Sequence, residues 1–158
     1  MDDFAPPSTE QRQLALDHIE NWLLVLVEQN PAVDAVVADE EVDEDRWFVR
    51  VNGDAKDVYS VWFTLGQRTL TFETYVMPAP EENHAQFFES LLRRNHRLRE
   101  LRFSIGEESA VFLRGQLDLR HVDTEALDRI LGSVYVAIEQ CFQPAVRIGF
   151  ASRFNSMS

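Results

Sequence analysis

Hydrophobic and polar residues first form a helical pattern, over residues 9–29. Apolar residues recur there at steps of three and four, which is typical of an amphipathic helix. Ser8 and Gln11 match the capping box that begins many helices. The second half, residues 22–27, is apolar on nearly all sides, and a helix of this kind packs on more than one side. We therefore expect this helix to contact a sheet and a second surface.

Alternation of apolar and polar residues then predicts strands in a group of three and a group of two. Turn signals such as Asn52-Gly53-Asp54 make the connections short. Short connections indicate antiparallel pairing with one buried face. Residues 32–38 show a weaker pattern for one more strand. The predicted strands cover residues 47–51, 58–65, 69–77, 101–105 and 110–119.

Two more helices complete the pattern. The first covers residues 81–98, and Asn95 lies on its apolar stripe. Because an unpaired buried amide is costly, we expect Asn95 to bind the backbone of the following strand. The second helix begins after Asp123, carries Cys141 on its apolar stripe and is expected to end at Pro144. The order helix, three strands, helix, two strands, helix predicts an α+β fold, with an antiparallel sheet of about five strands covered by helices.

The length of 158 residues suits one compact domain. We expect this domain over residues 8–143, after a disordered arm over residues 1–7 and before a tail over residues 144–158. The longest apolar run, residues 22–27, is far shorter than the roughly 20 residues that span a membrane. The first residues lack the basic and apolar stretches of a signal peptide. We therefore expect a soluble, cytoplasmic protein without a membrane partner.

The net charge of −12 is concentrated in the first part of the chain. Residues 1–45 contain thirteen Asp and Glu and one Arg, whereas the remaining chain is neutral. An acidic protein repels the phosphates of nucleic acids, so we do not expect nucleic-acid binding. Residues 39–45 include six acidic side chains, which we interpret as a solvated turn. A cation site or an acidic docking surface are the alternatives.

The chain has no recognisable catalytic motif. Its four histidines lack the spacing of metal ligands, and a lone Cys141 on an apolar stripe is typical of a core residue. Nucleophile elbows and glycine-rich phosphate loops are absent from the sequence. We therefore expect no enzymatic activity, no metal and no cofactor. A small enzyme would need a polar pocket that gathers His84 or His121 with carboxylates.

An arginine-rich segment covers residues 93–102, where five of ten residues are Arg. Guanidinium groups bind carboxylates and phosphates, so Arg93, Arg97 and Arg102 are candidate contacts for an anionic ligand. The segment is also consistent with a charged helix end that balances the helix dipole. In a third interpretation it pairs with the acidic residues 39–45, within one chain or across a dimer.

Three segments of the sequence resemble the YbjN family. They are Thr69-Leu70-Thr71-Phe72, Phe88-x-x-Leu91-Leu92-x-x-Asn95 and Leu101-Arg102-Phe103-Ser104-Ile105. Members of this family are described as bacterial sensory-transduction regulators and are similar in fold to type III secretion chaperones of the Tir-chaperone kind. The resemblance covers nearly all of residues 8–143. It implies a non-enzymatic, often homodimeric α+β protein that binds other proteins.

The resemblance also implies where an interface would lie. Secretion chaperones hold extended client segments against apolar patches, and their middle helix commonly helps to form the dimer. Carried over to residues 81–98, this makes Phe87 and Leu91 candidate interface residues, together with Trp22 of the first helix. The implied function is a chaperone-like or regulatory protein-interaction domain that binds a partner's apolar segment as a homodimer. The alternative is a sensory or transcription-linked regulator that binds an anionic ligand through residues 93–102.

Overall fold

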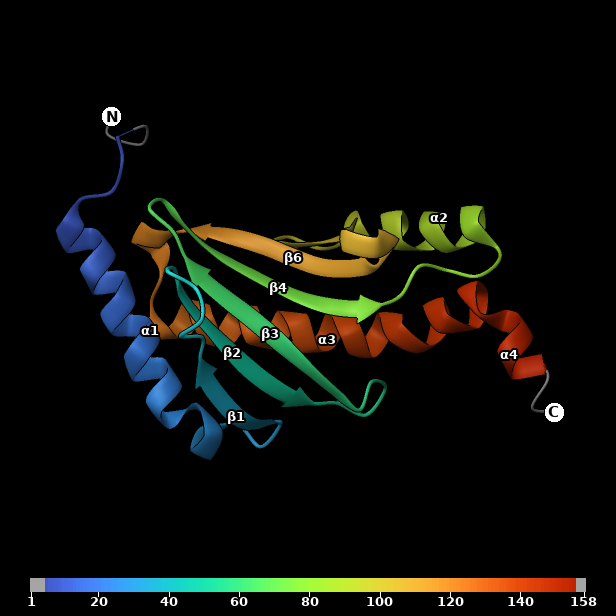
Figure 1. Ribbon diagram of the computed structural model, residues 1–158, viewed down its shortest axis with the longest axis horizontal. Coiled ribbons are helices and arrows are strands. Elements are labelled where there is room, and N and C mark those ends of the chain that lie inside the picture. Colours follow the sequence, from blue (N-terminus) through green and yellow to red (C-terminus); the bar gives the residue numbers. More distant parts are fainter. Residues whose placement is uncertain (1–4, 156–158) are drawn as a thin grey trace.

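A six-stranded antiparallel sheet with helices against one face forms the framework of the protein (Figure 1). The computed structural model describes residues 5–155. The α+β class and the antiparallel sheet expected from the sequence are confirmed. The elements in chain order are α1 (Thr9–Gln29), β1 (Val33–Ala38), β2 (Asp45–Asn52), β3 (Val58–Leu65), β4 (Thr69–Met77), α2 (His84–Asn95), β5 (Leu101–Ile105), the short 3-10 helix η1 (Glu107–Ser109), β6 (Val111–Asp118), the 3-10 helix η2 (Leu119–His121), α3 (Thr124–Gly149) and α4 (Ala151–Asn155).

The sheet has one strand more than the number of about five that the sequence predicts. The strand order is β1-β2-β3-β4-β6-β5, so the additional strand β1 forms one edge and β5 forms the other. β1 pairs with β2 from Val33↔Val51 to Ala38↔Trp47. Only Val33 is buried in β1, and Val37 is exposed. An edge strand with a single neighbour does not need regular apolar alternation, which explains the weak pattern of residues 32–38.

α1 begins as the sequence predicts. The Ser8 side chain accepts a hydrogen bond from the Gln11 backbone, and the Gln11 side chain accepts one from the Ser8 backbone, which completes the capping box. α1 and α3 lie against the inner face of the sheet, and α3 runs behind the strands in Figure 1. The Trp22 indole packs edge-on against Phe63 of β3, with 5.4 Å between the ring centres. The predicted contact of α1 with the sheet is therefore present.

The last long helix does not end at Pro144, as the sequence predicts, but continues to Gly149. Pro144 lies on the exposed side of α3, so the backbone hydrogen bond that proline cannot make is lost next to solvent. Ala145 and Gly149 are buried on the opposite side and hold the last turn against the core. The expected tail from residue 144 is thus replaced by the end of α3 and by α4. Residues 156–158 lie outside the described residues, as do residues 1–4 of the expected arm.

The middle helix is shorter than the predicted range 81–98. The backbone N–H groups of Glu81 and Glu82 both donate to the Gly149 carbonyl, at 2.9 and 3.1 Å. Asn83 then adopts a left-handed conformation with φ of 52°, and α2 begins at His84. These three residues therefore connect the start of α2 to the end of α3.

β3 and β4 are paired over only part of their lengths. Their register runs from Trp62↔Glu73 to Leu65↔Leu70, and the two strands diverge beyond it (Figure 1). The Thr74 hydroxyl donates to the Ser60 carbonyl at 2.8 Å where they separate. The pairing of β4 with β6 also shifts by a bulge between Tyr75 and Met77. The sheet is consequently open at the end that faces the turn between β2 and β3.

Candidate functional site

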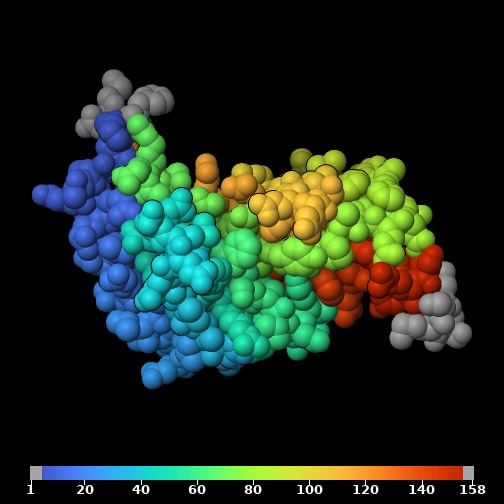
Figure 2. Space-filling model, in the orientation of Figure 1, coloured from blue at the N-terminus to red at the C-terminus, as the bar shows by residue number. Residues whose placement is uncertain are grey.

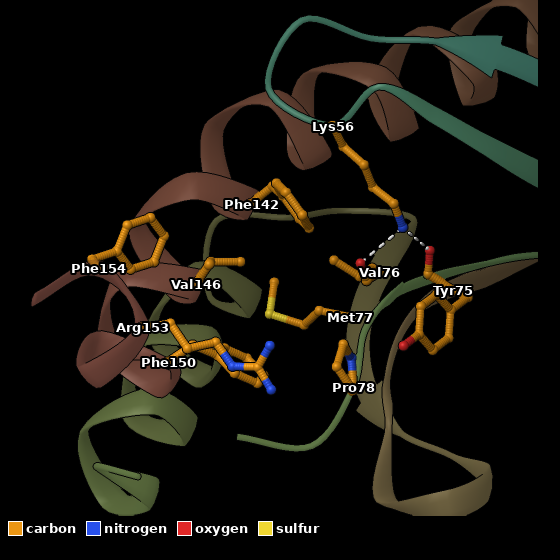
Figure 3. A pocket seen from close by; sticks show the side chains of 10 residues that line it. All are labelled: Lys56, Tyr75, Val76, Met77, Pro78, Phe142, Val146, Phe150, Arg153 and Phe154. Carbon is orange, nitrogen blue, oxygen red and sulfur yellow. Dashed lines mark hydrogen bonds between the residues drawn. The ribbon is translucent and has the colours of Figure 1, made fainter. Parts of the chain in front are cut away.

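An apolar pocket of about 400 Å³ lies at the open end of the sheet, between the end of β4, the second half of α3 and α4 (Figure 3). We call it the Lys56 pocket, because Lys56 reaches it from the turn between β2 and β3. Its volume lies within the range of small-molecule sites. Its lining residues are Lys56, Tyr75, Val76, Met77, Pro78, Phe142, Val146, Phe150, Arg153 and Phe154.

The Lys56 ammonium is bound by backbone carbonyls and surrounded by aromatic rings. It donates to the carbonyl oxygens of Tyr75 and Val76, each at 2.8 Å (Figure 3). Its nitrogen lies 5.0 Å from the centre of the Tyr75 ring and 5.7 Å from that of Phe142. No ion pair within residues 5–155 includes Lys56. Burial lowers the pKa of Lys56 to about 8 because the ammonium loses water.

α3 holds the turn that carries Lys56. The Glu139 carboxylate accepts hydrogen bonds from the backbone N–H groups of Asp54, at 3.1 Å, and Ala55, at 2.9 Å. A Cβ at Gly53 would lie 2.5 Å from a Glu139 oxygen, so glycine permits this close approach. The Tyr59 hydroxyl nearby is buried and has no hydrogen-bond partner among the described residues. Burial and the Glu139 charge raise the pKa of Tyr59 above its ordinary value.

We expect amine-reactive labelling of Lys56 to reach half of its maximal rate near pH 8, because the neutral amine is the reactive form. Lys56 is the only lysine of the chain, so peptide mass spectrometry separates it from the N-terminal amine. Since the unfolded lysine keeps its proton up to about pH 10.5, unfolding takes up a proton above pH 8. The Lys56 contribution to the free energy of unfolding therefore rises from pH 8 to 10. A labelling midpoint near pH 10.5 would contradict the dehydrated environment.

The three residues that the sequence predicts at an interface are buried in the core. The exposed fractions are 3% for Trp22, 0% for Phe87 and 5% for Leu91. The Trp22 indole N–H donates to an Asp128 oxygen at 2.7 Å, and the Phe87 ring packs against Gly149. These side chains are covered by their own chain and present almost no area to a partner. A partner that binds α1 or α2 therefore has to contact exposed residues beside these three.

α1 does expose a second apolar side, as its sequence predicts. Leu24 is 79% exposed, and Val25 and Val27 are also exposed. Leu24 and Val27 border a surface groove together with β1 and β2. We call this groove the α1 strip; it is lined by Glu20, Leu23, Leu24, Val27, Val36, Ala38 and Trp47.

A second apolar groove, of about 250 Å³, lies between α2 and the edge strand β5. Leu92 of α2 is 67% exposed and Ile105 of β5 is 60% exposed at this α2–β5 groove. The Asn95 amide donates to the Phe103 carbonyl at 3.1 Å and accepts from the Phe103 N–H at 2.7 Å. The predicted role of Asn95 is thus confirmed. The Asn95 side chain binds the N–H and the carbonyl of Phe103 on the free edge of β5, where a further strand would otherwise pair.

The three arginines predicted to contact an anion do not converge. Arg93 pairs with Glu89 on α2, with 3.7 Å between their charged atoms. Arg97 lines a depression that contains neither Arg93 nor Arg102. Arg102 lies on β5 directly opposite Arg114 of β6. All three are exposed to solvent.

The acidic residues 39–45 connect β1 to β2 as the predicted turn. Asp39 pairs with Arg46 at 3.8 Å, and Asp45 pairs with Arg12 of α1 at 2.9 Å. Within residues 5–155, the ion pairs of this turn are therefore made with Arg12 and Arg46 and not with the arginine-rich segment. The turn lies beside α1 on the face shown in Figure 2, at the same end of the molecule as the α1 strip.

A family model described as "Putative bacterial sensory transduction regulator", that of the YbjN family, matches residues 17–145. The chain belongs to the YbjN family.

The curated relatives of this YbjN-family protein include the uncharacterized protein ML2442 of Mycobacterium leprae (strain TN). It is 31% identical over 107 residues, which are 68% of this chain and 58% of that protein. The uncharacterized protein Mb0497 of Mycobacterium bovis (strain ATCC BAA-935 / AF2122/97) is 30% identical over 104 residues, which are 66% of this chain and 57% of that protein. The chain spans just under three fifths of the length of these relatives.

A solved structure shares the fold of the YbjN-family protein. The crystal structure of the ExsC–ExsE complex matches with a TM-score of 0.55 and 17% sequence identity, over 80% of this chain and 94% of that chain. The Yersinia pestis type III secretion chaperone SycH, crystallised with a stable fragment of YscM2, gives a TM-score of 0.49 at 14% identity, over 77% of this chain and 97% of that chain. The expected family and the expected chaperone-like α+β fold are confirmed.

Residues with reactive or metal-binding side chains are dispersed in the YbjN-family protein. Cys141 is buried in the core, as predicted, and burial raises the pKa of its thiol to about 11. Within residues 5–155, no three His, Cys, Asp or Glu side chains lie close enough together to hold a metal ion. The helices of this same part of the chain are too short or too polar to cross a membrane.

The sequence pattern did not predict the Lys56 pocket. Its walls come from three separate segments, and none of them shows the pocket by itself. The one signal in the sequence is a single lysine shortly after the Asn52-Gly53-Asp54 turn.

Proposed function

We propose that this YbjN-family protein is a non-enzymatic protein-interaction module, chaperone-like or regulatory, that binds an apolar segment of a partner protein and forms a homodimer in the cytoplasm. The observation that carries the proposal is the exposure of Leu24 on α1 and Leu92 on α2. These are large apolar side chains beside apolar grooves, where contiguous exposed patches mark interaction sites.

The α1 strip suits a partner segment. Leu24 and Val27 would cover apolar side chains of the partner, while Ala38 connects the groove to the acidic turn that follows β1. A cluster of negative charges at one end favours a partner segment with basic flanking residues, since complementary charge steers association. The ExsC–ExsE structure is itself a complex, which agrees with a binding role for this fold.

The α2–β5 groove suits self-association. Leu92 and Ile105 lie on neighbouring elements at an edge of the sheet, so two copies could bury both side chains symmetrically. Asn95 already binds the outer backbone groups of Phe103. Contact between copies would therefore rely on side chains more than on strand pairing. The alternative, an anion-binding regulator that uses residues 93–102, has less support because Arg93 is paired with Glu89 and Arg97 lines a depression that contains neither Arg93 nor Arg102.

A photoreactive p-benzoylphenylalanine at position 24 is expected to crosslink a partner protein in cells that naturally make the protein. The same group at the exposed position 125 of α3 serves as the matched control. Leu24→Asp should abolish partner binding but leave self-association unchanged. Leu92→Asp should lower self-association, measured by analytical ultracentrifugation, without changing the circular dichroism spectrum. Equal crosslinking from both positions would overturn the partner surface, and a wild-type monomer at all concentrations would overturn the dimer.

A further inference from the structure

We propose that the Lys56 pocket binds a small amphiphilic carboxylate, with its apolar tail inside the pocket and its carboxylate paired with Lys56. This site is separate from the α1 strip and the α2–β5 groove, so the inference does not depend on the proposed protein partner. Three properties of the pocket favour this class of ligand: its apolar walls, the position of its cations, and the partial dehydration of the Lys56 ammonium.

The walls select an apolar tail. Met77, Phe142, Val146 and Phe150 surround one shared space, and Phe154 lies at its rim (Figure 3). A volume of about 400 Å³ is small for a protein segment but sufficient for a medium-length alkyl chain. Binding there would remove apolar surface from water on both sides, which provides the main part of the binding free energy.

The cations select a negative head group. Lys56 and Arg153 are the two charged residues of the lining. The Arg153 guanidinium is paired with Glu81, at 2.6 Å. Lys56, in contrast, has no carboxylate within ion-pair distance among the described residues, and the nearby Glu139 is bound to the backbone of Asp54 and Ala55.

A partly dehydrated ammonium without a counterion is costly, and an anion from outside would compensate it. Two of its three N–H groups already donate to the Tyr75 and Val76 carbonyls, so one donor remains for a ligand. A single positive charge with one remaining donor matches a carboxylate better than a doubly charged phosphate. The turn that carries Lys56 is fixed by Glu139, so the ammonium needs little reorganisation before it binds.

Dodecanoate is the probe that tests this inference, used below its micellar concentration in isothermal titration calorimetry. We expect one saturable site per chain, with affinity roughly tenfold or more above that of dodecanol, because the carboxylate gains a charge-assisted hydrogen bond. Dodecyltrimethylammonium should bind no better than dodecanol. Lys56→Met should reduce dodecanoate affinity to that of dodecanol, whereas Lys56→Arg should retain a preference for the carboxylate.

The pH dependence gives an independent readout. Dodecanoate stays ionised above pH 7. The titratable or charged groups that face Lys56 or its turn are Asp54, Asp57, Tyr59, Tyr75, Glu139 and Arg153. Affinity should therefore fall as pH rises above 8 in the wild type, and Lys56→Met should remove this dependence. Val146→Trp, which fills the pocket, should abolish binding of both dodecanoate and dodecanol. Equal affinity for dodecanoate and dodecanol, or an unchanged affinity in Lys56→Met, would overturn the proposal.

Discussion

Phe87→Ala is expected to lower the free energy of unfolding by about 3–5 kcal/mol, the usual cost of removing a buried aromatic side chain. The Phe87 ring is completely buried and packs against Gly149 and the neighbouring Phe88 ring. Truncation would leave a cavity where α2 meets the end of α3, because the backbone there is tied by the Gly149 carbonyl and cannot collapse freely. Urea denaturation followed by tryptophan fluorescence measures the change.

Leu92→Ala is the matched control on the same helix. Its side chain is mostly exposed, so we expect a change of less than about 0.5 kcal/mol in the free energy of unfolding. Self-association, measured by analytical ultracentrifugation, should respond in the opposite way: Leu92→Ala weakens it, and Phe87→Ala leaves it unchanged under conditions where both variants are folded. A stable Phe87→Ala variant that has lost self-association would restore Phe87 as an interface residue.

Asn95→Ala is expected to lower the free energy of unfolding by about 1–3 kcal/mol, because it leaves partly buried backbone groups without partners. Both the N–H and the carbonyl of Phe103 depend on the Asn95 amide. Denaturation measures the loss, and hydrogen exchange should show faster exchange of the Phe103 amide. Asn95→Asp keeps an acceptor for the Phe103 N–H but has no donor for the Phe103 carbonyl. It should therefore lower the free energy of unfolding less than Asn95→Ala does.

Asn95→Ala should also change the behaviour of the edge strand β5. An edge strand with unpaired backbone groups is a template for pairing with another chain. We therefore expect greater concentration-dependent aggregation of Asn95→Ala than of the wild type in static light scattering. Unchanged protection of the Phe103 amide together with unchanged stability would show that Asn95 does not bind the edge in solution.

The elements with strong local signals could be predicted from the sequence. The Ser8 capping box set the start of α1, and the Asn95 contact followed from an amide on an apolar stripe. β1 was less clear because an edge strand needs few apolar residues. The end of α3 was misjudged because Pro144 faces solvent, where the helix tolerates it, and tertiary packing of the next turn outweighs its local effect.

The candidate site was less accessible from the sequence. Helical spacing identified an apolar stripe on α2, but it could not separate Leu91, which the core covers, from Leu92, which it does not. The arginine-rich segment looked like one site because its residues are consecutive, although it passes from a helix into a strand, so that Arg93 lies on α2 and Arg102 lies on β5. The Lys56 pocket depends on tertiary structure alone.

Because β3 and β4 are paired over only a short stretch, the sheet consists of two parts, β1-β2-β3 and β4-β6-β5, that are weakly joined. Register partners join β2 to β3 along the whole of both strands, whereas β3 and β4 meet only near the turn between them. Bending of the sheet will therefore concentrate between β3 and β4, where the fewest backbone hydrogen bonds resist it. Because Lys56 extends from the turn between β2 and β3 to the β4 backbone, its two hydrogen bonds join the two parts of the sheet, and removing this side chain will let them move apart more easily.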